Sequence, residues 1–94
     1  MEKLRWLELS NNQISFIENN SFANLKQLEH IYLQFNNLKI INSNHFSNIQ
    51  SLDRLNLANN QISFIENNSF SILKKLTYLN LQFNNLKIIK SNLF

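Results

Sequence analysis

The sequence predicts an α/β repeat solenoid, with short parallel strands on one face and loops or short helical turns on the other. Two observations predict this class: a repeat of 24 residues runs through the chain, and a Leu-x-Leu alternation occurs once in each repeat. We expect a single domain over residues 1–94, without recognisable caps. Its units are residues 4–27, 28–51, 52–75 and a shorter last unit, 76–94.

The alternation in each unit predicts a short, half-buried strand with a side-chain period of two. Because one strand per unit has no partner inside that unit, the strands of neighbouring units must pair and form a parallel sheet. These strands lie about 4.8 Å apart while the return path is wider, so the stack is expected to curve with its strands on the concave side. The expected strands lie near residues 6–8, 30–32, 54–56 and 78–80.

An Asn stands at position nine of every unit, where the chain turns inward after the strand. Such a turn buries backbone N–H and C=O groups, and an Asn side chain offers both a donor and an acceptor for them. We interpret this column as a structural ladder, and the Phe column at position nineteen as stacked core. The ladder residues are Asn12, Asn36, Asn60 and Asn84, and the aromatic column is Phe22, Phe46, Phe70 and Phe94.

Each unit follows the pattern L-x-x-L-x-L-x-x-N-x-L/I, as in residues 52–62, and carries its Phe near the end. This pattern resembles the leucine-rich repeat, and the unit length resembles the typical subclass of Toll-like, Slit-like and lamprey variable lymphocyte receptors. The resemblance covers residues 4–94. It implies an extracellular or cell-surface location, although the sequence shows neither a signal peptide nor cysteine-rich caps.

A second period of 48 residues indicates that a two-unit block was duplicated. Residues 11–22 are identical to 59–70, and residues 33–41 to 81–89, whereas seven of eight outward strand positions differ between the blocks. Large aromatic and charged side chains on an outward face are typical of interface hot spots. We therefore expect a binding surface on the concave face. Its candidate residues are Trp6, Glu8, His30, Tyr32, Phe35, Arg54, Asn56, Tyr78, Asn80 and Phe83.

The function expected from this surface is a non-catalytic module that binds a protein or peptide. The alternative is a structural element that associates with itself through uncapped ends or through a flank. The flank is suggested by a second apolar column at position thirteen, next to the inward column at position fourteen. We expect both columns to pack partly in a broadened core, and an exposed apolar stripe is the alternative. The column consists of Phe16, Ile40, Phe64 and Ile88.

Several other classes of function are not expected. The chain has no Cys and no Gly, which excludes disulfides, a thiol nucleophile and Gly-rich phosphate loops. Glu8, His30 and Arg54 lie on successive strands, but nothing in the sequence fixes a catalytic geometry. No metal site is expected, because His30 and His45 fall on different faces, and no cofactor is expected.

Charge and hydropathy predict that neither nucleic acid nor the membrane interior is a partner of this segment. The net charge of +3 comes from lysines spread along the return path, which predicts that nucleic acid is not a partner. No run of about 18 apolar residues exists, so insertion of this segment into a membrane is not expected. Asn19 and Asn67 begin Asn-x-Ser sequences and are candidate glycosylation sites if the protein is secreted.

Overall fold

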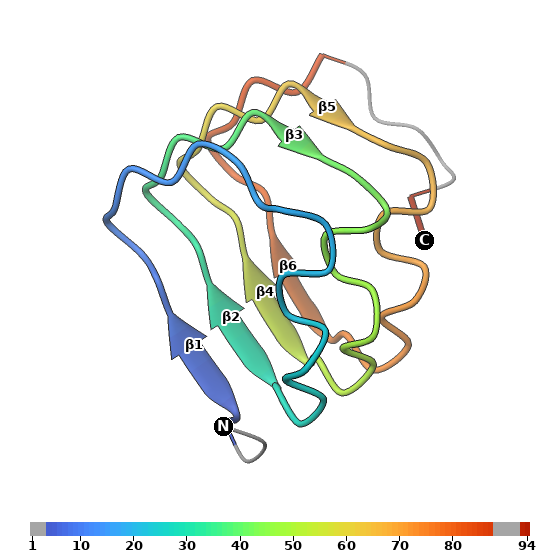
Figure 1. Cartoon of the computed structure of the whole chain (residues 1–94). Coiled ribbons are helices and arrows are strands. Elements are labelled where there is room, and N and C mark those ends of the chain that lie inside the picture. Colours follow the sequence, from blue (N-terminus) through green and yellow to red (C-terminus); the bar gives the residue numbers. More distant parts are fainter. Residues whose placement is uncertain (1–3, 88–92) are drawn as a thin grey trace.

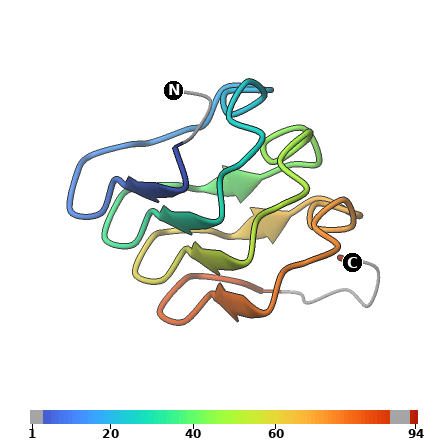
Figure 2. The ribbon, with the colours of Figure 1, turned by 90° about the horizontal axis from the view of Figure 1, so that it is seen from below.

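The chain forms a stack of four coils in the computed structural model, which describes residues 4–87 and 93–94. Each coil contributes one strand to a parallel sheet in the order β1-β2-β4-β6 (Figure 1). Successive coils lie one above another when the molecule is seen from below (Figure 2). The predicted solenoid is thereby confirmed. Its four strands are β1 (Trp6–Glu8), β2 (His30–Tyr32), β4 (Arg54–Asn56) and β6 (Tyr78–Asn80).

The register of this sheet follows the repeat, so that equivalent residues of successive units stand side by side. Trp6 pairs with His30, His30 with Arg54 and Arg54 with Tyr78. The middle residue of each strand points inward, and Ile31 is fully buried in β2. The flanking strand residues consequently point outward and form the outer sheet face, which the sequence analysis expected to be concave.

A second small sheet lies on the return path, opposite the first (Figure 1). It consists of β3 (Ile40–Ile41) and β5 (Phe64–Ile65), which pair in parallel. The rest of the described return path consists of turns and irregular backbone and contains no helix. The sequence analysis missed this sheet. Its strands contain two adjacent apolar residues each, so no alternation marks them in the sequence.

The second sheet determines where the columns at positions thirteen and fourteen point. Strand geometry sends neighbouring side chains to opposite faces, so only one of the two columns can enter the core. Ile41 and Ile65 do so, whereas 69% of Phe16, 53% of Ile40 and 50% of Phe64 is exposed. The expected broadened core is therefore wrong, and the three exposed residues form an apolar flank stripe. Ile88 and Ile89 lie outside the described residues.

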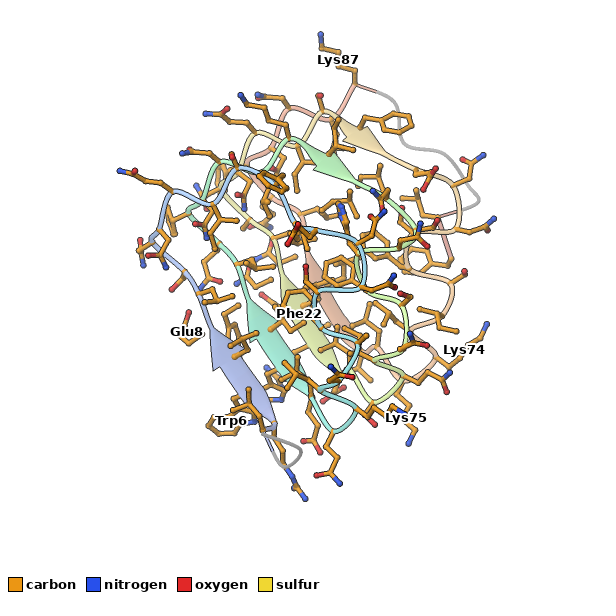
Figure 3. All side chains as sticks on the ribbon, in the orientation of Figure 1. Trp6, Glu8, Phe22, Lys74, Lys75 and Lys87 are labelled. Atoms are coloured by element: carbon orange, nitrogen blue, oxygen red, sulfur yellow. The ribbon has the colours of Figure 1, made fainter. Side chains whose placement is uncertain are left out.

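The core between the two sheets contains three residues of the predicted aromatic column, whereas the fourth, Phe94, is 68% exposed and not part of the core. The Phe46 ring is fully buried, with its centroid 6.2 Å from that of Phe22 and 6.3 Å from that of Phe70. Phe22 points into the interior of the coil, whereas Trp6 and Glu8 project outward from β1 (Figure 3). Leu and Ile side chains from every described unit surround these rings.

Asparagine side chains connect each coil to the one before it. The amide nitrogen of Asn60 donates to the carbonyl oxygens of Leu33 and Leu57, at 3.0 and 3.1 Å, and its Oδ1 accepts from the N–H of Leu38. Asn36 repeats these bonds one unit earlier, and Asn84 one unit later. Asn12 is exposed and donates only within its own unit, to the carbonyls of Leu9 and Ser10.

Candidate ligand-binding face

The outer sheet face carries a row of large planar side chains, here called the aromatic row: Trp6, His30, Arg54 and Tyr78. The Trp6 and His30 rings stack with centroids 5.2 Å apart and planes within 4°. The Arg54 guanidinium carbon lies 5.7 Å from the centroid of the Tyr78 ring, within the range of a cation–π contact. Exposure is 65% for Trp6 and 39% for Tyr78. The row is thus both accessible and held by its own contacts.

A second row, here called the polar row, consists of Glu8, Tyr32, Asn56 and Asn80. Three of its members accept a hydrogen bond from a backbone N–H two residues later: Glu8 from Ser10, Asn56 from Ala58 and Asn80 from Gln82. These bonds hold the turn that follows each strand. The polar row therefore also stabilises the turns that follow the strands, a role that was not expected from the sequence.

Tyr32 and Asn80 link the polar row to the aromatic row. The Tyr32 hydroxyl lies 3.0 Å from Nδ1 of His30, and its ring meets the His30 ring edge-on. Asn80 donates from Nδ2 to the Tyr78 hydroxyl at 3.1 Å. Both rows thus form one connected surface over all four strands, and the structure brings together eight of the ten candidate binding residues on it.

The remaining two candidates, Phe35 and Phe83, stand on an adjoining row, here called the edge row: Asn11, Phe35, Asn59 and Phe83. All four have positive φ angles, between 56° and 60°. Asn tolerates this left-handed conformation because its short side chain bonds locally, whereas a bulky side chain pays about 1–2 kcal/mol of steric strain there. The two phenylalanines therefore occupy a backbone conformation that disfavours them.

Both strained phenylalanines are also exposed, Phe35 by 52% and Phe83 by 74%. The aromatic pairs found among the described residues include neither ring. The backbone around them is fixed, because the N–H of Phe35 donates to the carbonyl of Ala58 at 3.1 Å. The strain at these positions is therefore not offset by aromatic packing within the described chain.

Position two of each unit adds residues that the sequence analysis did not select. An exposed ion pair joins Arg5 and Glu29 at 3.9 Å, and Thr77 donates a hydrogen bond to Asp53. Such a surface pair contributes little to stability, so these side chains remain available to a ligand. A signal was present, because position two differs between the duplicated blocks just as the aromatic row does.

The residues considered for catalysis have other partners on this face. Glu8 accepts from Ser10, His30 bonds to Tyr32, and Arg54 lies over Tyr78. No group of three or more His, Cys, Asp and Glu side chains suited to a metal ion occurs in the described parts of the chain. Asn19 and Asn67 are exposed on the return path.

His45 lies on the return path and is 96% buried by its surroundings, with only 4% exposed. Its Nδ1 accepts a hydrogen bond from the N–H of Asn42 at 3.2 Å, which requires a ring that is not protonated at that atom. Burial lowers the pKa of His45, and the nearby Glu66 carboxylate opposes this shift only partly. The hydrogen bond from the Ser43 N–H lowers the pKa of Glu66. His45 therefore serves the fold and not the candidate face.

The repeat model described as "Leucine rich repeat" matches residues 1–38 and 30–86. The chain belongs to the leucine-rich repeat family. No match was found among the curated proteins. Within residues 4–87 and 93–94, this leucine-rich repeat domain has no helix of the length and hydropathy needed to span a membrane.

Two solved structures of leucine-rich repeat receptors are similar to this domain. The Toll chain of the Drosophila Toll–Spatzle complex is 29% identical with a TM-score of 0.89, over 93% of this chain and 12% of Toll. The TLR13 chain of the TLR13–ssRNA13 complex is also 29% identical with a TM-score of 0.89, over 97% of this chain and 13% of TLR13. The leucine-rich repeat domain thus spans about an eighth of each receptor chain.

The prediction that excluded nucleic acid as a partner is wrong, because TLR13, a structural relative, was solved with ssRNA13. That prediction depended on lysines being spread along the sequence. Coiling brings residues of different units together, however, and Lys39 and Lys87 line one surface hollow of about 570 Å³ on the return path. Spacing along the sequence of a leucine-rich repeat chain therefore does not measure clustering of charge on its surface.

Proposed function

We propose that this chain is a non-catalytic binding module that holds a protein or peptide on its outer sheet face. The observation that carries this proposal is the aromatic row, in which Trp6 stacks on His30 and Arg54 lies over Tyr78. Trp, Tyr and Arg are the residue types that dominate binding energy at interfaces. Because these side chains already restrain each other, less conformational entropy is lost when a ligand binds.

The geometry of the row favours a protein or peptide ligand. Trp6 stacks on His30 and is still 65% exposed, so it offers a large apolar surface whose orientation is already restrained. The aromatic and polar rows also carry a positive charge at Arg54 and a negative charge at Glu8, so both acidic and basic side chains of a protein partner find a counter-charge there.

Alanine substitutions at Trp6, Tyr32, Arg54 and Tyr78 test this function. Each is expected to cost on the order of 2 kcal/mol of binding energy, or about thirtyfold in Kd, because each truncates a central contact. The measurement is isothermal titration calorimetry with a partner captured on the immobilised chain. Circular dichroism checks that the fold is kept.

The matched controls are Lys74→Ala and Lys75→Ala, which lie on the return path away from Trp6 (Figure 3). They should leave Kd unchanged. Loss of binding in these controls, with full affinity in the four face variants, would show that the outer sheet face is not the site. Capture of a nucleic acid whose affinity falls steeply with rising salt would identify that class of ligand instead.

The exposed flank stripe favours a second candidate function, association of two copies of this chain. Lys39 and Lys87 lie before the stripe in their coils, and Glu18 and Glu66 lie after it; all four are exposed. A two-fold axis along the stripe would bury Phe16, Ile40 and Phe64 against their copies. The same axis would set the lysine side of one copy against the glutamate side of the other.

Sedimentation equilibrium distinguishes this association from a monomeric module. The parent chain is expected to reach the mass of a dimer at high micromolar concentration, and Phe64→Asp is expected to keep it monomeric. Phe35→Asn serves as the control, because it changes a Phe outside the stripe that is 52% exposed, close to the 50% of Phe64. A parent chain that stays monomeric at about millimolar concentration rules out this candidate.

A further inference from the structure

The two phenylalanines of the edge row are strained and exposed, and the residues of this row are the same in both duplicated blocks. The fold alone does not require phenylalanine at these positions. Phe35 and Phe83 stand in the left-handed conformation where the other two units carry Asn. Outward strand positions differ in seven of eight comparisons between the duplicated blocks, yet the edge row is the same in both. Strained residues that packing does not explain are typical of functional sites.

The edge row and its neighbours along the chain contain no charged residue, although the Glu8 carboxylate contacts Ser10 in the first unit. Positions seven to ten of the units contain only Ser, Ala, Asn, Gln and Phe, and they comprise residues 10–13, 34–37, 58–61 and 82–85. A segment that packs on Phe35 and Phe83 therefore meets no charged side chain from these positions and gains little there from carrying charge itself. The zone is continuous with the polar row, whose Asn80 bonds to the backbone of Gln82.

An amide lies between the two phenylalanines. Asn59 occupies the unit between theirs, and in the described chain it bonds through its backbone N–H, to the Gln82 carbonyl at 2.9 Å. Its partly exposed side chain is therefore available to donate to, and accept from, a passing peptide backbone. The row thus presents an aromatic ring, an amide and a second aromatic ring in sequence.

We propose that the edge row is a docking site for an uncharged, extended segment of the type Pro-x-x-Pro, whose two prolines pack on Phe35 and Phe83. This inference rests on the proposed function, because it names a partner class for the same binding module. The polyproline II conformation leaves backbone groups unbonded, which suits the Asn59 amide, and proline rings pack well on aromatic side chains.

The spacing of the two rings fits this conformation. Strands of neighbouring units lie about 4.8 Å apart, which places residues two units apart at about 9.6 Å. Residues i and i+3 of a polyproline II helix lie about 9.3 Å apart on one face. Residues i and i+7 of an α-helix lie about 10.5 Å apart, and a helix has no free backbone groups for the amide. The extended segment is therefore the better match.

Peptide titration followed by ¹H–¹⁵N NMR tests the site. The probe is a neutral, Ser-flanked Pro-Ala-Ala-Pro peptide, and its isomer with prolines at i and i+2 is the spacing control. Shift changes are expected to concentrate at the edge row, and the probe is expected to bind at least about tenfold more tightly than the isomer. Equal binding of both peptides, or shifts elsewhere on the chain, overturns the proposal.

Phe35→Asn and Phe83→Asn separate binding from folding, because Asn is the residue that the other two units place at this position. Each variant is expected to weaken probe binding at least about tenfold while melting at the same temperature as the parent or a few degrees higher. Lys74→Ala, an exposed residue of the return path outside both surfaces, is the control and is expected to change neither the binding nor the shifts of the edge row. Unchanged probe affinity in both edge-row variants contradicts the site.

These results are distinguishable from those for the proposed function. If a captured partner depends on Trp6 and Tyr78 but not on Phe35 and Phe83, the edge-row site fails and the binding module stands. If the captured partner depends on Phe35 and Phe83 but not on Trp6 and Tyr78, the aromatic row is not the site of binding. A helical peptide with Leu at i and i+7 that outcompetes the proline probe also rejects the extended-segment assignment.

Discussion

Replacing Phe46 with Ala is expected to lower the free energy of unfolding by about 3–5 kcal/mol. The Phe46 ring is fully buried between the rings of Phe22 and Phe70, so its removal leaves a cavity in the middle of the stack. Backbone hydrogen bonds to the coils on both sides prevent the surroundings from closing this cavity completely. Urea unfolding followed by circular dichroism measures the loss as a lower midpoint at an unchanged slope.

Phe94→Ala provides the matched control for this prediction. Phe94 belongs to the same aromatic column, with its centroid 5.7 Å from that of Phe70, but 68% of it is exposed. Its truncation removes less apolar area from the interior and is expected to cost about 1 kcal/mol or less. Equal losses in the two variants would contradict the view that burial between neighbouring coils provides most of the stability.

Asn60→Ala and Asn36→Ala are expected to lower the free energy of unfolding by about 3 kcal/mol each, and Asn12→Ala by about 1 kcal/mol or less. The side chain of Asn60 satisfies the carbonyls of Leu33 and Leu57 and the N–H of Leu38, and truncation leaves these groups unpaired. Each buried group that loses its partner costs roughly 1–3 kcal/mol. Asn12 is exposed, and its described hydrogen bonds go to the carbonyls of Leu9 and Ser10 in its own unit. Water can donate to these carbonyls when the Asn12 side chain is removed.

Thermal unfolding of the three variants side by side checks this prediction. A loss of about 1 kcal/mol lowers Tm by roughly 4–8 °C in a chain of this size, so the expected difference between Asn60→Ala and Asn12→Ala is well resolved. The outcome against the prediction is an equal shift in Tm at all three positions. That result would mean that the amide bonds between coils contribute no more than those within a coil.

The sheet could be predicted from the sequence because its signal is repeated. The Leu-x-Leu alternation recurs in every unit at the same spacing, and the bounds expected for the four strands agree with those of β1, β2, β4 and β6. The second sheet could not be predicted in the same way. Its strands contain two residues each, and two adjacent apolar residues do not distinguish a strand from a wide core.

The residues that form the candidate face could be predicted from the sequence, but the contacts between their side chains could not. The alternation sends Trp6, His30 and Tyr78 outward, whereas ring stacking and the Tyr32–His30 contact depend on side-chain rotamers that no spacing specifies. The strain at Phe35 was also invisible, because a positive φ is expected from Gly or Asn and not from Phe. The distribution of charge on the surface could not be predicted from spacing along the sequence, because coiling makes distant residues neighbours.

The asparagine hydrogen bonds between coils join residues that are 22 or 27 positions apart in the sequence, and the strand pairs join residues 24 positions apart. Each coil therefore contacts the coil before it and the coil after it, as in a one-dimensional chain of coupled units. A lesion in either central coil divides such a chain into pieces of fewer than three units, which are too short to persist alone. The cooperativity of these four coils thus depends on a few central contacts, while the outward residues can change without breaking it.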